Sequence, residues 1–203
     1  MSESLKKFKF RKNSKNDSKL FFFTDRKRFA DIFQIIENLP RKTTVIIREY
    51  DLEYKDRLLF AKEIVKIARK KALITLSGKS LRLHLEAKTN GVHFSDNDKS
   101  WQKYLFHQKF NPKLLLSCSC HDEKSIRKAQ KFQINFIFFS PIFETNSHLD
   151  SKIIGHRRLA KISRKFSNNA QIFGLGGINK DNVKLLKNTN ISGIGFISLA
   201  ANN

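Results

Sequence analysis

Two glycine-containing segments near the end of the chain have the composition of a phosphate-binding site. GLGGIN (174–179) follows an apolar run and precedes a helical pattern, and GIGFIS (193–198) forms the next apolar run. Adjacent glycines let backbone N–H groups approach an anion without interference from a Cβ atom. We therefore predict a phosphate site that includes Gly176 and Gly177, with a simple tight turn as the alternative.

Two further segments carry polar side chains directly after apolar runs. GVHFSDND (91–98) places Asp96 and Asp98 where carboxylates could hold Mg²⁺ together with a diphosphate. Acidic residues that cap a helix would give the same pattern. SPIFETNSH (140–148) ends in Thr145, Ser147 and His148, which is either an active-site loop rich in donors or a loop with capping residues.

The elements that must position these residues are short apolar runs alternating with amphipathic segments. We expect eight strands, at 19–25, 43–50, 72–77, 91–95, 113–119, 135–143, 171–177 and 193–198. Helical spacing of apolar residues occurs at 30–39, 56–71, 122–132, 155–166 and 179–188, with Asp122 and Asn179 as predicted N-caps. This alternation predicts an α/β fold, a single-domain (β/α)8 TIM barrel of parallel strands, with an open doubly wound sheet as the alternative.

Composition places the chain in a broad class. It has 203 residues with a formal net charge of +22, and 40% of its residues are hydrophobic, enough for a packed core. We expect residues 1–18 to form a flexible basic arm and 19–203 the barrel domain. No run approaches the roughly 20 apolar residues of a membrane span, and no secretory signal is present, so we expect a cytoplasmic protein.

The positive charge attracts polyanions, but no nucleic-acid-binding motif accompanies it. Basic residues are spread along the whole chain. Coding bias and affinity for small phosphorylated ligands therefore explain the charge better than a nucleic-acid partner does. The sequence is compatible with a monomer or a homo-oligomer. Cys118 and Cys120 are two apart within a predicted strand, where a disulfide would be strained, so we expect free thiols.

Seven segments in register resemble the thiamine phosphate synthase family and its thiazole tautomerase branch. In chain order these segments are TD (24–25), REYD (48–51), GVH with a following Asp (91–98), S-x-S-x-H (117–121), SPIFET-x-SH (140–148), GLGGIN (174–179) and GIGFIS (193–198). The resemblance covers about residues 19 to 200. It implies a transferase that joins hydroxymethylpyrimidine diphosphate to thiazole phosphate with Mg²⁺, releasing pyrophosphate and thiamine phosphate.

The same resemblance implies roles for individual residues. Arg48 and Ser119 would contact the diphosphate, and the catalytic set would be Arg48, Ser119 and His148. Substrate binding would involve the following residues: Lys79, Thr145, Ser147, Gly176, Gly177, Ile197 and Ser198. Asp98 would be a Mg²⁺ ligand.

This chain departs from the family pattern at several of these positions. The family's Q-x-R-x-K after the second strand is Ile46, Arg48 and Tyr50 here. Lys79 stands near the place of a Mg²⁺-binding Asp after the third strand, and His148 replaces a Lys. The histidine of the tautomerase branch is Pro141. We therefore expect Mg²⁺ to bind weakly or not at all, with Lys79 supplying fixed positive charge, and a non-catalytic or regulatory relative is the alternative function.

Overall fold

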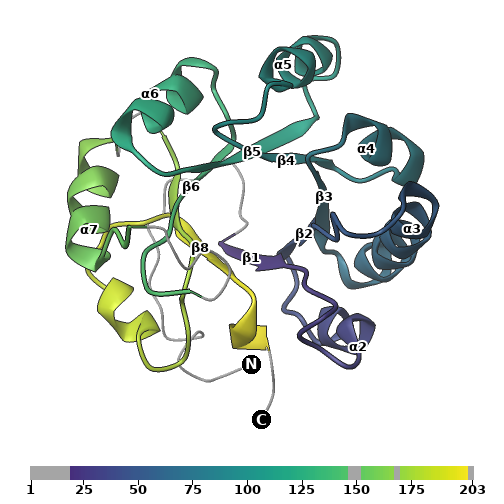
Figure 1. The fold of residues 1–203 in the computed structure, drawn as a ribbon, viewed down its shortest axis with the longest axis horizontal. Helices are drawn as coiled ribbons and strands as arrows, with labels where there is room; N and C mark the ends of the chain where they lie inside the picture. The colour runs from purple at the N-terminus through teal and green to yellow at the C-terminus, as the bar shows by residue number, and fades with distance from the viewer. Residues whose placement is uncertain (1–18, 146–151, 167–169, 201–203) are drawn as a thin grey trace.

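The computed structural model describes residues 19–145, 152–166 and 170–200. The predicted basic arm at 1–18 lies outside this range. Eight parallel strands form a closed barrel in the order β1-β2-β3-β4-β5-β6-β7-β8, and Figure 1 shows them as an inner ring with helices outside. The strands are β1 (Leu20–Phe23), β2 (Thr44–Ile47), β3 (Ile74–Gly78), β4 (Gly91–Ser95), β5 (Leu115–Cys120), β6 (Phe136–Phe139), β7 (Ile172–Gly174) and β8 (Gly193–Phe196). The predicted barrel is confirmed.

The barrel closes by pairing of its first and last strands. In the register of this pair, Phe21 lies beside Gly195 and Phe22 beside Phe196. Most predicted strands extended past the observed ends, because strand pairing stops before the residues, polar as well as apolar, that lead into the loops. Residues 140–143, for example, follow β6 as a loop and not as strand.

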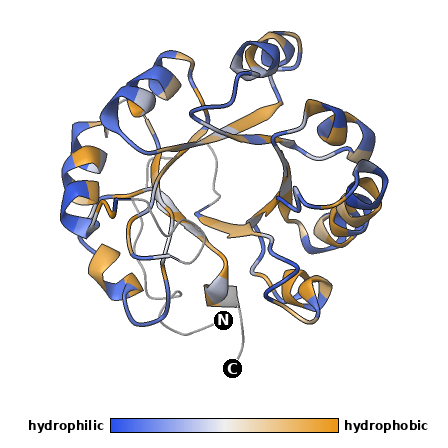
Figure 2. Cartoon of the chain, in the orientation of Figure 1, coloured by the Kyte–Doolittle hydropathy of each residue, from blue (hydrophilic) through white to orange (hydrophobic). Residues whose placement is uncertain are grey.

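Alternation of side chains explains why the strands are almost continuously apolar. Phe21 and Phe23 pack inside the barrel with Phe136, Phe138 and Phe173, and the Phe21 ring centroid lies 4.9–5.0 Å from the centroids of the last three rings. The residues between them along each strand point outward, toward the helices. Figure 2 shows the resulting pattern, with hydrophobic strands inside and hydrophilic outer faces on the helices.

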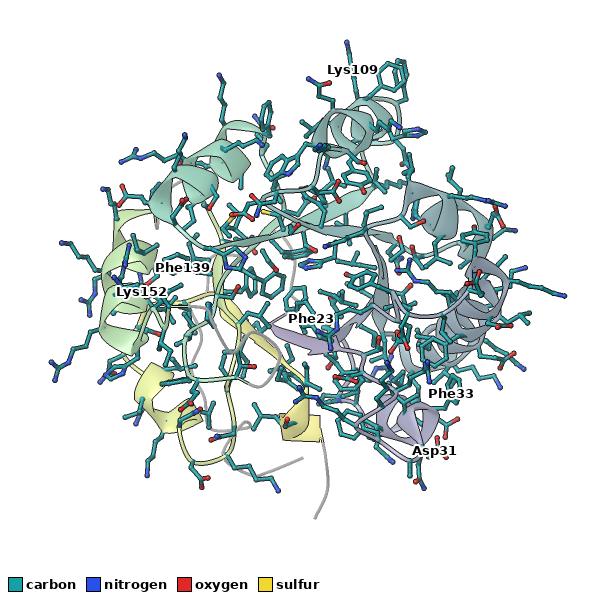
Figure 3. The ribbon with its side chains drawn as sticks, in the orientation of Figure 1. Phe23, Asp31, Phe33, Lys109, Phe139 and Lys152 are labelled. Carbon is teal, nitrogen blue, oxygen red and sulfur yellow. The ribbon has the colours of Figure 1, made fainter. Side chains whose placement is uncertain are left out.

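The helices form the outer layer. They are α2 (Ile32–Glu37), α3 (Tyr54–Lys71), α4 (Leu81–Ala87), α5 (Trp101–Phe110), α6 (Glu123–Lys131) and α7 (His156–Lys165), with 3₁₀ turns η1 (Val183–Leu186) and η2 (Ser198–Ala200). Asp122 is the N-cap of α6, as predicted, and accepts a 2.7 Å hydrogen bond from the Ser125 N–H. In Figure 3 Phe23 lies near the centre of the barrel, whereas Lys109 projects outward from α5.

Three local predictions need correction. The sequence pattern did not predict α4 or α5. In α5 the large aromatic residues do not form one apolar stripe: Phe106 and Phe110 are exposed. Residues 179–188 contain only the short η1, whose N-cap is Asn182. The Asn179 side chain instead accepts hydrogen bonds from the backbone N–H groups of Asp181 and Asn182 in the turn before it.

Cys118 and Cys120 are buried free thiols on the outer side of β5, with their Sγ atoms 3.6 Å apart. Burial raises the pKa of the Cys118 thiol well above its usual value, so it stays protonated. Among the described helices, none combines the length and apolar character needed to cross a membrane.

Candidate active site

A cavity of about 720 Å³ opens at the carboxyl ends of the strands. This is the end of a parallel barrel where the loops that follow the strands gather. Eight of the predicted site residues line it: Arg48, Lys79, Ser119, Thr145, Gly176, Gly177, Ile197 and Ser198. Ser147 and His148 lie outside the described residues. Asp98 is described, but it is not part of the cavity wall.

Arg48 is held rigidly at the ends of β1 and β2. Its Nε donates to the Thr24 carbonyl oxygen at 2.8 Å, its backbone N–H donates to Thr24 Oγ1 at 3.0 Å, and its Nη2 lies 3.5 Å from Asp25 Oδ2. The Thr24 hydroxyl in turn donates to the Glu49 carboxylate at 2.6 Å. Burial raises the pKa of Glu49. These contacts present the guanidinium to the cavity in a fixed orientation.

Two further cationic side chains gather around the ring of Tyr50. The Arg57 guanidinium carbon lies 5.0 Å from the ring centroid and the Lys79 Nζ lies 5.4 Å from it, both within the range of cation–π attraction. Arg57 also donates to the Gly78 carbonyl oxygen at 2.6 Å, and the Lys79 N–H donates to the His93 carbonyl oxygen at 2.7 Å. Lys79 is thus tied by backbone and ring contacts to β3, β4 and the loop after β2.

The floor of the cavity contains a neutral histidine. His93 Nδ1 lies 2.8 Å from the Ser117 hydroxyl, and its Nε2 lies 3.2 Å from the Ser119 hydroxyl. The ring packs edge-to-face against Phe23 and Phe138. Burial, with Arg48 and Lys79 nearby, lowers the pKa of His93 to about 3. His93 therefore adds no positive charge near neutral pH and orients the Ser119 hydroxyl.

The loop after β7 is bonded to the loop after β6. Ile142 N–H donates to the Leu175 carbonyl oxygen at 2.9 Å, and Phe143 N–H donates to the Gly176 carbonyl oxygen at 3.1 Å. Gly177 has φ +67°, and a Cβ atom there would lie 2.2 Å from the Glu144 carbonyl oxygen. Within the described chain, the N–H groups of Gly176 and Gly177 have no acceptor. Gly177 is therefore required for this close approach, and the two glycines keep two donors at the wall.

The two aspartates after β4 have different surroundings. Both Asp98 oxygens are engaged in the start of α5, one by the Ser100 N–H at 2.7 Å and the other by the Tyr104 hydroxyl at 3.2 Å. Asp96 lies on the cavity wall, and its buried Oδ1 has no hydrogen-bond partner. His121 Nε2 lies 4.0 Å from that oxygen. Asp96 is therefore the aspartate of this pair that is placed to meet a cation in the cavity.

No group of three or more His, Cys, Asp or Glu side chains suited to a metal occurs within residues 19–145, 152–166 and 170–200. A divalent cation would consequently need ligands from a bound phosphate as well as from Asp96. Mg²⁺ is commonly held in this way, by one or two carboxylates and substrate phosphate oxygens. The wall fits a cation of this kind only when a phosphorylated ligand is present.

Asp96 was considered together with Asp98 as a possible Mg²⁺ ligand, whereas Tyr50, His93 and His121, which also line the wall, had no predicted role. His93 lies within an otherwise apolar strand. Its role becomes visible only in the structure, where its side chain is on the inward face of β4 against Phe23 and Phe138. Position after an apolar run, the signal that identified Asp96 after β4, was also available for His121 after β5. Contact between them required the barrel register.

Comparison with known proteins agrees with this architecture. The sequence model of the thiamine monophosphate synthase family matches residues 20–200. A chain of Aquifex aeolicus, named provisionally as a second thiamine-phosphate synthase, is 29% identical over 184 residues, which cover 89% of this chain and 96% of that one. The thiamine-phosphate synthase of Clostridium tetani is 28% identical over 190 residues, 92% of this chain and 89% of the relative.

A solved structure shares the fold. The thiamine phosphate pyrophosphorylase of Pyrococcus furiosus superposes with a TM-score of 0.76 at 22% identity, covering 92% of this chain and 89% of that one. Taken with the family match over residues 20–200, it follows that this chain belongs to the thiamine monophosphate synthase family.

Proposed function

We propose that this chain joins hydroxymethylpyrimidine diphosphate to thiazole phosphate, yielding thiamine phosphate and pyrophosphate. Family membership makes it a transferase of thiamine biosynthesis. The observation that carries the specific reaction is one cavity with two different anion-binding walls: backbone donors at Gly176 and Gly177, and the cations Arg48 and Lys79. Its volume of about 720 Å³ suits small ligands.

The thiazole phosphate belongs, in this proposal, at the wall formed by the ends of β7 and β8. Gly176 and Gly177 supply backbone N–H groups from the loop after β7, and Ile197 and Ser198 supply backbone N–H groups from the loop after β8. Phosphate binding by the loops after the last two strands is common in such barrels. Thr145, which also lines the cavity, and Ser147 complete the proposed contacts.

The diphosphate belongs at the cationic wall. Arg48 is already oriented by Thr24 and Asp25, so little side-chain freedom is lost when it binds an anion. Lys79 adds a second charge from β3, and the Ser119 hydroxyl, oriented by His93, adds a donor. His148 keeps its proposed catalytic role, although it is outside the described residues.

The chemistry requires breaking the bond between the pyrimidine methylene carbon and the diphosphate oxygen. The electron pair leaves with the diphosphate, the pyrimidine becomes a carbocation, and the thiazole nitrogen then bonds to the methylene carbon. Arg48 and Lys79 would stabilise the negative charge that develops on the leaving group, and the cavity would hold the two reactants in line. A neutral His93 adds no competing charge beside the cationic intermediate.

Magnesium has a limited place in this proposal. When bound, it would neutralise charge on the diphosphate, and Asp96 is the aspartate after β4 that lies on the wall to hold it. Asp98 could serve only if its contacts to Ser100 and Tyr104 were broken. We therefore propose weak Mg²⁺ binding by the free protein. Small phosphorylated substrates and a cytoplasmic location belong to the same proposal.

Calorimetric titration of the purified chain tests the two-wall assignment. We expect thiazole phosphate and hydroxymethylpyrimidine diphosphate to bind together with one copy of each per chain, with and without Mg²⁺. Inorganic phosphate should compete at the glycine wall and pyrophosphate at the cationic wall. Competition of both ligands for one shared position would contradict the proposal.

A further inference from the structure

Asp96 and His121 face each other from neighbouring strands at the cavity wall. In the barrel register Ser95 of β4 lies beside Ser119 of β5, and the Asp96 N–H donates to the Ser119 carbonyl oxygen at 3.0 Å. The first residue after β4 is thereby fixed near the first residue after β5. Their closest polar atoms, Asp96 Oδ1 and His121 Nε2, are 4.0 Å apart.

The tautomer of His121 is fixed by its other nitrogen. His121 Nδ1 lies 2.8 Å from the Ser140 carbonyl oxygen, which can only accept a hydrogen bond. Nδ1 must therefore carry the proton. In the neutral ring Nε2 then presents a lone pair toward Asp96, which is the arrangement found for metal-binding histidines whose second nitrogen donates to a carbonyl group.

Asp96 Oδ1 is buried and lacks a hydrogen-bond partner. A buried carboxylate oxygen without a partner is energetically unfavourable, so a native site normally compensates it. The 4.0 Å separation is too long for a hydrogen bond to His121. A group between the two atoms would satisfy both of them.

We infer that Asp96 and His121 are two ligands of a divalent transition-metal ion. Ligands about 2.0–2.1 Å from a tetrahedral metal lie about 3.3 Å apart, so the two atoms need to close by less than about 1 Å. The His121 side chain is 45% exposed and can make this adjustment. A nitrogen ligand favours Co²⁺ or Zn²⁺ over Mg²⁺, which prefers oxygen.

Water and diphosphate oxygens would complete the coordination, so this inference deepens the proposed function and rests on it for the diphosphate. Lys79 and Arg48 line the same cavity and disfavour a bare cation. A bound diphosphate neutralises that charge and adds ligands. Metal affinity should therefore rise when the anion is present.

Titration of the full chain with Co²⁺, followed by calorimetry and visible absorption, tests the site. We expect one Co²⁺ per chain, bound at least about tenfold more tightly with pyrophosphate present. Asp96→Asn and His121→Gln should each weaken Co²⁺ binding by at least about tenfold, as loss of one of two protein ligands requires. Mg²⁺ should compete poorly.

Two control variants make the result specific. His107→Gln removes a histidine of α5 outside the cavity, and Asp98→Asn removes the other aspartate of the loop; both should retain Co²⁺ binding. Loss of binding in Asp98→Asn but not in His121→Gln would overturn the inference in favour of an oxygen-only site. Failure of the wild-type chain to bind Co²⁺, with or without pyrophosphate, would overturn it as well and leave the pair as an ion pair. Circular dichroism verifies that each variant is folded.

The same titrations separate this inference from the proposed function. Pyrophosphate binding that is indifferent to Co²⁺ and to His121→Gln would contradict the metal site and leave the proposed function standing. Co²⁺ binding through Asp96 and His121 in a chain that binds neither pyrophosphate nor the pyrimidine diphosphate would support the metal site and contradict the proposed function.

Discussion

Mild acid should destabilise this protein through His93. In the folded chain burial holds the pKa of His93 at about 3, whereas its ordinary value is 6.5. The unfolded chain therefore binds a proton below pH 6.5 that the folded chain refuses, and stability falls as the pH falls through this window. At 1.36 kcal/mol per pH unit, lowering the pH from 7.5 to 5.0 should remove about 2 kcal/mol from the free energy of unfolding.

The assay is urea unfolding at pH 7.5 and 5.0, followed by circular dichroism, for the wild-type chain and His93→Gln. Other groups titrate in the same range: burial also lowers the pKa of His84 and acts in the same direction, whereas the raised pKa of Glu49 acts in the opposite direction. His84 and Glu49 are present in both proteins, so their contributions cancel when the two losses of unfolding free energy are subtracted. The remaining difference reports the titration of His93.

We expect the wild-type chain to lose about 2 kcal/mol more than His93→Gln between the two pH values. The variant will be less stable at pH 7.5, because two serine contacts change. That offset does not affect the comparison. An equal loss in both proteins would show that His93 is not held neutral in the folded state, and would refute the assignment of an uncharged floor.

Three substitutions test the two walls. Gly177→Ala should abolish binding of inorganic phosphate and should lower the melting temperature more than Gly155→Ala does. Both glycines have positive φ, but a Cβ at Gly155 meets no atom within 4 Å. Equal effects of the two substitutions would refute the close approach at Gly177. Lys79→Met should weaken pyrophosphate binding by about 1–3 kcal/mol in calorimetry, whereas Lys109→Met should not. Arg48→Lys keeps the charge but loses the Nε contact to Thr24, so pyrophosphate should bind about tenfold more weakly; wild-type affinity would mean that the fixed guanidinium is unimportant.

Periodicity was sufficient to predict the barrel because inward and outward faces of each strand are both buried. Phe136 and Phe138 fill the interior while Ile137 and Phe139 meet the helices, so β6 appears in the sequence as an unbroken apolar run. The same signal failed for α5. Its aromatic residues are distributed around the helix, and two of them remain exposed.

The candidate site was only partly predictable. Residues after strands could be expected at one mouth, and the eight named above gather there. Side-chain direction could not be inferred: Asp98 turns to the start of α5 whereas Asp96 faces the cavity. That difference depends on hydrogen bonds to Ser100 and Tyr104, which appear only once the helix is in place.

Product formation tests the central proposal most directly. The wild-type chain is incubated with hydroxymethylpyrimidine diphosphate and thiazole phosphate, with Mg²⁺ or Co²⁺, and thiamine phosphate and pyrophosphate are quantified by chromatography. We predict equal amounts of the two products, with the rate reduced in Arg48→Lys and Lys79→Met. Binding of both substrates without any product under either metal would contradict the proposed transferase activity and favour a non-catalytic or regulatory role.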